Sequence, residues 1–188
     1  MSKLYATQND LLMKNLMVFY NKNNNLEKIL KIINGESPIS LRLIDWFATN
    51  YSKKNFTVIQ HIKEDNKVIR TKVYVDYKLK LKAYSKKRFD PFCRWERINI
   101  PHTIDGNEVF IQTTIGQLNF FKWAYEKKII DYIENHLEEI NNDMNKRNST
   151  SRSKKDKNKK TRKKREELSV SASKSIKKEN VEIIVEFK

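Results

Sequence analysis

Hydrophobic positions in the first fifty residues recur at helical spacing. Residues 8–20 and 26–33 each carry apolar side chains three and four positions apart, and the second series stops at Gly35. Ser37 precedes a proline, a pair typical of a helix N-cap with proline at the first helical position. The pattern therefore predicts two N-terminal helices and a third that runs from Ser37 to about Tyr51.

The period then changes from helical spacing to two. Apolar and polar positions alternate over 56–62, and over an unusually long stretch at 69–84. One face of the longer stretch is apolar, and the other is basic with two tyrosines. This pattern favours a long antiparallel strand with one solvated face. Residues 105–106, Asp-Gly, separate two further alternating runs at 95–104 and 108–115, and predict a hairpin there.

Signals near the end of this hairpin predict an edge strand and a return to helix. Pro101 lies within the first hairpin strand, where it indicates an edge strand or a break. Thr114 and Gln117 have the spacing of a capping box at a helix start. Apolar positions that continue to Met144 predict one long helix, or two helices joined at 127–128.

The composition changes sharply beyond residue 144. Residues 146–165 contain twelve Lys or Arg residues and one acid. A segment so poor in apolar side chains buries too little surface to offset its ordering entropy, so we expect 145–180 to be disordered. The last segment, 181–188, is β-branched and alternating, and predicts a short strand or an interaction motif.

The predicted elements give an α+β fold in one domain, residues 1–144. It comprises N-terminal helices, an antiparallel sheet of about four or five strands and a C-terminal helical segment, followed by the disordered basic tail. The strand at 181–187 either returns to this protein's own sheet or adds to the sheet edge of a protein partner. The sequence leaves both options open.

Net charge narrows the class of partner. The chain has 39 Lys and Arg residues against 23 Asp and Glu residues, a formal net charge of +16. Nucleic acid, or another polyanion, is the partner that such a charge favours. No apolar run approaches the length of about 20 residues that a membrane span needs, so no membrane partner is expected.

The sequence lacks the signatures of common catalytic and metal sites. Its single cysteine, Cys93, excludes an internal disulfide and Cys-rich zinc sites, and its three glycines exclude the known Gly-rich phosphate loops. His61, His102 and His136 stand alone, without a second ligand at metal-binding spacing. We therefore expect no enzymatic activity and no cofactor, unless these side chains converge with carboxylates in space.

Two groups of residues are candidates for nucleic-acid contact. The first is the polar face of the predicted long strand: Arg70, Lys72, Tyr74, Lys78, Lys80, Lys82 and Tyr84. The second lies in the tail: Lys154, Lys155, Lys159, Lys160, Arg162, Lys163, Lys164 and Arg165. Lysines contact phosphates without reading sequence, and tyrosines stack on unpaired bases. An ordinary solvated sheet face, and a tail that serves as a nuclear-import signal or solubilising linker, are the alternatives.

Several stretches carry a resemblance to known proteins. They are Leu41–Phe47, Thr49–Asn55, Leu81–Lys87, Phe89–Arg94, Thr113–Thr114 and Gly116–Phe121. These stretches resemble a small uncharacterised protein family of nucleocytoplasmic large DNA viruses, over about residues 40–135. The resemblance implies a viral protein located in the host cytoplasm or nucleus, or packaged in the virion. It implies no catalytic residue, since the family has no assigned activity.

Two functions fit these observations. The first is a non-enzymatic viral protein that binds DNA or RNA through its basic tail and through the basic, aromatic sheet face. The second is a structural virion protein, a minor capsid or core component whose folded part docks on other virion proteins. Loss of binding on removal of the basic tail distinguishes the first function from the second.

Overall fold

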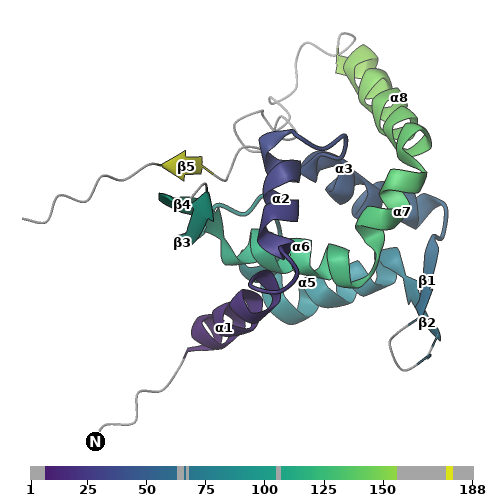
Figure 1. Ribbon diagram of the computed structural model, residues 1–188. Coiled ribbons are helices and arrows are strands. Elements are labelled where there is room, and N and C mark those ends of the chain that lie inside the picture. Colours follow the sequence, from purple (N-terminus) through teal and green to yellow (C-terminus); the bar gives the residue numbers. More distant parts are fainter. Residues whose placement is uncertain (1–6, 63–65, 67, 105–106, 156–176, 180–188) are drawn as a thin grey trace, which may run out of the picture.

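Helices make up most of the computed structural model, which describes residues 7–62, 66, 68–104, 107–155 and 177–179. The helices are α1 (Gln8–Tyr20), α2 (Asn25–Asn34), α3 (Leu41–Trp46), the π-helical segment η1 (Phe47–Tyr51), α4 (Ser52–Lys54), α5 (Val73–Phe89), α6 (Ile115–Glu126), α7 (Ile129–Asn135) and α8 (Leu137–Lys155). Figure 1 shows α5 and α6 side by side, with α8 projecting from the body.

The strands form two small antiparallel sheets at the edges of the helical body (Figure 1). One sheet pairs β1 (Val58–Ile62) with β2 (Val68–Lys72), and the other has the order β3 (Arg97–Ile104), β4 (Asn107–Thr114), β5 (Lys177–Glu179). The α+β class and the antiparallel pairing are confirmed. Among the described residues, no helix is both long and apolar enough to cross a membrane.

The first two predicted helices are confirmed, but the predicted start of the third is wrong. That helix begins at Leu41, and Ser40 caps it by accepting a hydrogen bond from the Leu43 N–H at 3.2 Å. Ser37 instead accepts from the Ile39 N–H at 3.2 Å. The helix starts later because residues 37–39 form a turn that places the Ile39 side chain, which is completely buried, in the core.

The long strand expected at 69–84 is also wrong beyond Lys72, because a helix, α5, begins at Val73. The segment is rich in lysine and leucine, which are good helix formers. Val73 and Tyr77 lie four residues apart and are both buried, which is the spacing of one helix face. The helical conformation therefore places both side chains in the core, whereas the alternating pattern alone indicated a strand.

The core is centred on α6, in which nine of the twelve residues are buried. Four aromatic rings meet there with centroids 5.6 to 6.4 Å apart, namely Tyr77, Phe89, Phe120 and Trp123. Gly116 lies against backbone: a Cβ there would stand 3.0 Å from the Asp90 carbonyl oxygen and 3.1 Å from the Lys87 carbonyl oxygen. The first turn of α6 is thus seated directly on the end of α5.

The predicted cap at Thr114 and the predicted break at 127–128 are confirmed, but the sequence did not predict a second break at His136. Thr114 accepts a hydrogen bond from the Gln117 N–H at 3.2 Å and so caps α6. Lys128 adopts a left-handed conformation, with φ of 57°, and separates α6 from α7. A further break at His136 separates α7 from α8.

The helix α8 continues to Lys155, past residue 145, where the sequence predicts the basic tail to begin. The first turns of α8 are anchored on the core through Ile140, so the helix propagates from an established nucleus into the polar segment. The other predicted tail residues, apart from the three of β5, lie outside the described residues, as does the predicted strand at 181–187.

The hairpin around 105–106 is confirmed by the pairing of β3 with β4. Pro101 lies in β3, which is an edge strand among the described residues, as its missing N–H predicts. β5 pairs with β4, with Glu179 opposite Phe110. This pairing shows that the chain just before the predicted terminal strand returns to its own sheet.

Candidate nucleic-acid interface

The helix α5 divides the predicted basic face into two groups. Successive helical residues point about 100° apart, so Tyr74, Lys78 and Lys82 share one side of α5. Lys80 and Tyr84 lie on the other side, with the Lys80 Nζ 5.8 Å from the Tyr84 ring centroid. The seven residues therefore do not form the single face that the strand pattern predicted.

Arg70 and Lys72 belong to β2 instead of α5. Both side chains are exposed, and the register places Gln60 opposite Arg70 and Val58 opposite Lys72. They extend the basic surface from the start of α5 onto the outer face of the hairpin. The exposed apolar pair of Ile62 and Val68 follows on that same face.

The first group on α5 lines an open groove of about 520 Å³. The groove residues are Tyr74, Val75, Lys78, Leu79, Leu81 and Lys82. Val75 is 50% exposed and Leu79 is 60% exposed, so this surface of α5 combines exposed apolar side chains with the ammonium groups of Lys78 and Lys82. Asp76 is the sole acid on α5, and it accepts a hydrogen bond from the Trp123 indole N–H at 2.6 Å, away from the groove.

Two lysines on α4 connect the groove to α8. The Lys53 Nζ lies 5.5 Å from the Tyr74 ring centroid on α5. The next residue, Lys54, reaches the other way and places its Nζ 3.1 Å from Asp143 Oδ1 on α8. Cationic side chains thus follow one another from α5 across α4 to α8.

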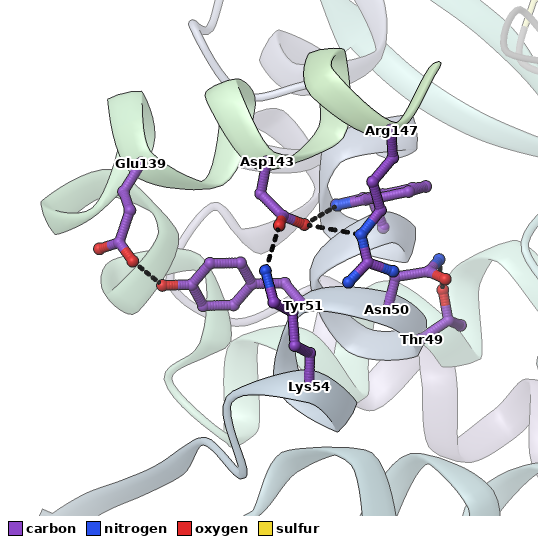
Figure 2. A network of polar contacts seen from close by, with 8 residues as sticks. Thr49, Asn50, Tyr51, Lys54, Glu139, Asp143 and Arg147 are labelled. Atoms are coloured by element: carbon purple, nitrogen blue, oxygen red, sulfur yellow. Dashed lines mark hydrogen bonds and ion pairs between the residues drawn. The ribbon is translucent and has the colours of Figure 1, made fainter. Parts of the chain in front are cut away.

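Asp143 is the centre of a polar network between α8 and the residues around η1, shown in Figure 2. The Trp46 indole N–H donates to Asp143 Oδ2 at 3.2 Å, and Arg147 Nε lies 3.7 Å from the same oxygen. The Tyr51 hydroxyl donates to Glu139 one turn earlier on α8. The network therefore fixes the first half of α8 to the folded body.

The network also sets the titration of its acids and phenols. Burial alone raises the pKa of Asp143, but hydrogen bonds from Lys54 and Trp46 and the charge of Arg147 outweigh it and lower that pKa. Burial and the neighbouring Glu139 carboxylate raise the pKa of Tyr51 well above its usual range. Asp143 is therefore ionised and Tyr51 neutral at pH 7.

The tail candidates are only partly within the described residues. Lys154 and Lys155 belong to the last turn of α8, and the segment that precedes them includes Lys146 and Arg147. The remaining tail candidates, 159–165, lie outside the described residues. The beginning of the basic segment is thus helical and continuous with the anchored part of α8.

Lys53, Lys54, Asp143 and Arg147 were missed as site residues at the sequence level. The adjacent lysines stand within a stretch that carries the viral resemblance, but nothing there indicated their role. Trp46 and Asp143 are 97 residues apart, so no local pattern predicts their contact. Only the packing of α8 against η1 brings these side chains together.

The hydrogen bonds and ion pairs of this network do not include the histidines or the cysteine. The His61 Nδ1 is buried on β1 without a hydrogen-bond partner, and the His136 ring stacks on Tyr132 with centroids 4.2 Å apart. Cys93 is a half-buried free thiol. Within the described part of the chain, no group of His, Cys, Asp and Glu residues is arranged to hold a metal ion.

Comparisons with known proteins agree with the viral resemblance. Residues 1–188 match the family described as "Family of unknown function (DUF7197)". The chain is 48% identical over 128 residues to "Uncharacterized protein L507" of Acanthamoeba polyphaga mimivirus. This match covers 67% of the chain and 49% of the relative, so the chain spans about half the relative's length. No solved structure matches. The expected relation to an uncharacterised viral protein family is confirmed, and the chain belongs to the family of unknown function DUF7197.

Proposed function

We propose that the protein is a non-enzymatic viral nucleic-acid-binding protein that contacts phosphates mainly through its basic segment, residues 146–165. The observation that supports this proposal most strongly is the continuity of α8. Its first half is held on the body by Asp143, and its second half carries the beginning of the basic segment. The first cations of the segment, up to Lys155, therefore belong to a helix with a fixed base.

The physical basis is counterion release. Twelve Lys or Arg residues and one acid lie within 146–165, so the segment can neutralise several phosphates at once. Such contacts give tight binding at low salt and weak binding at high salt, with little preference for sequence. The exposed cations of α4 and α5 add a second contact surface on the folded body.

Fluorescence anisotropy of the full chain tests this proposal against duplex DNA, single-stranded DNA and RNA over a range of salt concentrations. The test variant replaces Lys160, Arg162, Lys163 and Lys164 with Gln. Because α8 continues to Lys155, substitution is preferable to truncation at 145, which would cut the helix. The matched control removes four exposed charges from α1, the α1–α2 loop and α2, by replacing Lys14, Lys22, Lys28 and Lys31 with Gln.

The tail variant is expected to lose most of the affinity at about 0.15 M salt, and the control variant much less. Equal losses in the two variants would mean that overall charge, not the basic segment, drives binding. Unchanged affinity in the tail variant would overturn the proposal.

A second candidate function is a structural virion component, and the β1–β2 hairpin favours it. Ile62 and Val68 are 69% and 54% exposed, and they stand opposite each other on the outer face. Exposed apolar side chains grouped in this way are typical of a protein contact. Ile62→Thr with Val68→Thr should then reduce incorporation into virus particles while leaving nucleic-acid affinity unchanged.

A further inference from the structure

We propose that the α5 groove binds a single-stranded segment of nucleic acid, with a base stacked on Tyr74 and phosphates contacted by Lys78 and Lys82. This inference rests on the proposed nucleic-acid function and specifies its substrate class. It concerns the folded body, whereas the basic segment contacts the phosphates of paired and unpaired strands alike.

The chemistry of the groove matches the two parts of a nucleotide. Val75 and Leu79 expose apolar surface, and the half-buried Tyr74 lies on the same side of α5. Lys78 and Lys82 are exposed beside them, and none of the groove residues is an acid. Apolar and aromatic surface suits a base, and ammonium groups suit the phosphates on either side of it.

The geometry favours an unpaired strand over a duplex. Lys78 and Lys82 lie about 6 Å apart along the helix axis, which is comparable to the distance between successive phosphates of an extended strand. In a duplex the bases are stacked inside and their faces are covered, so a tyrosine on the protein surface reaches only the backbone or a groove edge. An unpaired strand can turn one base onto the ring.

The path beyond the groove is also cationic. Lys53 lies over the Tyr74 ring at 5.5 Å, and Lys54 leads to Asp143 and Arg147 at the start of the basic segment. A strand that leaves the groove along α4 passes Lys53 and then the cluster of Lys54, Asp143 and Arg147, whose two cations and one carboxylate leave a net positive charge. A ligand bound in the groove can therefore continue towards the first residues of the basic segment on α8.

The test uses the full chain with a fluorescent oligothymidine and a duplex of the same length, at one fixed salt concentration. The variants are Tyr74→Ala, Tyr74→Phe and the double substitution K78Q/K82Q. The control is K28Q/K31Q, which removes two exposed charges from α2. Circular dichroism and thermal unfolding of each variant confirm that the fold is retained.

Tyr74→Ala is expected to weaken oligothymidine binding about tenfold and to leave duplex binding unchanged, because stacking needs an unpaired base. Tyr74→Phe keeps the ring and should bind like the wild type. K78Q/K82Q should weaken oligothymidine binding more than K28Q/K31Q does.

Equal weakening of both ligands by Tyr74→Ala would overturn the stacking inference. The same holds if K78Q/K82Q and the α2 control behave alike. In either case the tail variant described above still decides the proposed function: if it alone loses affinity, the function stands and only the groove inference fails.

Discussion

Asp143 is the residue on which the attachment of α8 depends most. It lies near Trp46, Lys54 and Arg147, of which only Arg147 shares its helix, and its side chain is only 14% exposed. An ion pair with an exposed lysine is worth little by itself. A charge-assisted hydrogen bond to a half-buried indole contributes more, because the indole N–H would otherwise lose its partner.

Asp143→Asn should lower the free energy of unfolding by about 1–2 kcal/mol at pH 7. Asp143 has a lowered pKa in the fold, so its contribution is present above the ordinary aspartate pKa and is lost as the pH falls through the lowered value. The difference between variant and wild type should therefore shrink below about pH 4.

Urea unfolding at several pH values measures this difference. Asp131→Asn is the control, because Asp131 forms an exposed pair with Lys128 and should change stability by less than about 0.5 kcal/mol. A variant of Asp143 as stable as the wild type at pH 7 would contradict the anchoring role.

The pKa of Asp45 is shifted in the direction opposite to that of Asp143. Burial, together with the charge of Asp90, raises the pKa of Asp45 to about 7. The folded chain then binds a proton that the unfolded chain has already released, so this residue makes stability fall as the pH rises from about 4 to about 7.

Asp45→Asn should remove this fall in stability with rising pH. The stability gain over the wild type is expected to grow between about pH 4 and about pH 7, to on the order of 4 kcal/mol at pH 8. Thermal unfolding at pH 4, 5.5, 7 and 8 measures the trend. A gain that is the same at every pH would show that ionisation of Asp45 is not its cause.

At the scale of elements, the contact between α5 and α6 organises the fold. The aromatic cluster joins the two helices, and Gly116 lets the first turn of α6 approach the backbone at the end of α5. Since the nearest atoms are carbonyl oxygens and an amide nitrogen, a side chain at this position has no flexible neighbour to displace.

Gly116→Ala should therefore lower stability by about 2 kcal/mol, because α6 must shift away from α5. Gly35→Ala is the matched comparison. No atom lies within 4 Å of a Cβ at Gly35, but its φ of 78° disfavours alanine, so a smaller loss of about 1 kcal/mol is expected there. Equal effects in urea unfolding would mean that sterics at Gly116 are relieved by local adjustment.

The helix α5 also shows where a sequence pattern gave the wrong secondary structure. Lysines and leucines alternate in the middle of α5, and this alternation is typical of a strand with one wet face. A helix forms because Val73 and Tyr77, four residues apart, both reach the aromatic core. Tertiary burial of two side chains outweighs the local period of the residues that follow them.

At the scale of the whole molecule, positive charge is concentrated along α5, α4 and the C-terminal part of α8. This arrangement predicts a specific salt dependence. Replacing Lys160, Arg162, Lys163 and Lys164 with Gln should reduce the slope of log K against log salt by on the order of three, since each lost phosphate contact removes nearly one unit.

Anisotropy titrations with duplex DNA measure both slopes. The control variant on α1, the loop after it and α2 should retain the wild-type slope, because its charges are distributed over another surface. A tail variant with the wild-type slope would show that these four cations contact no phosphate.

The sequence by itself determined the features that depend on neighbouring residues. The N-terminal helices, the cap at Thr114, the hairpin at 105–106 and the break at 127–128 follow from side chains within a few positions of one another. Such signals act over one turn of chain and are therefore visible in the sequence. The overall basic charge, and with it the proposed class of partner, is also independent of the fold.

Only the tertiary structure decided how the candidate site is arranged. The helical form of α5 separates Lys80 from Lys78 and Lys82, and the packing of α8 brings Asp143 to Trp46 across 97 residues. Lys53 becomes a neighbour of Tyr74 for the same reason. Contacts between distant segments depend on which faces of the helices and strands are buried in the core. The spacing of residues along the chain does not predict which faces those are.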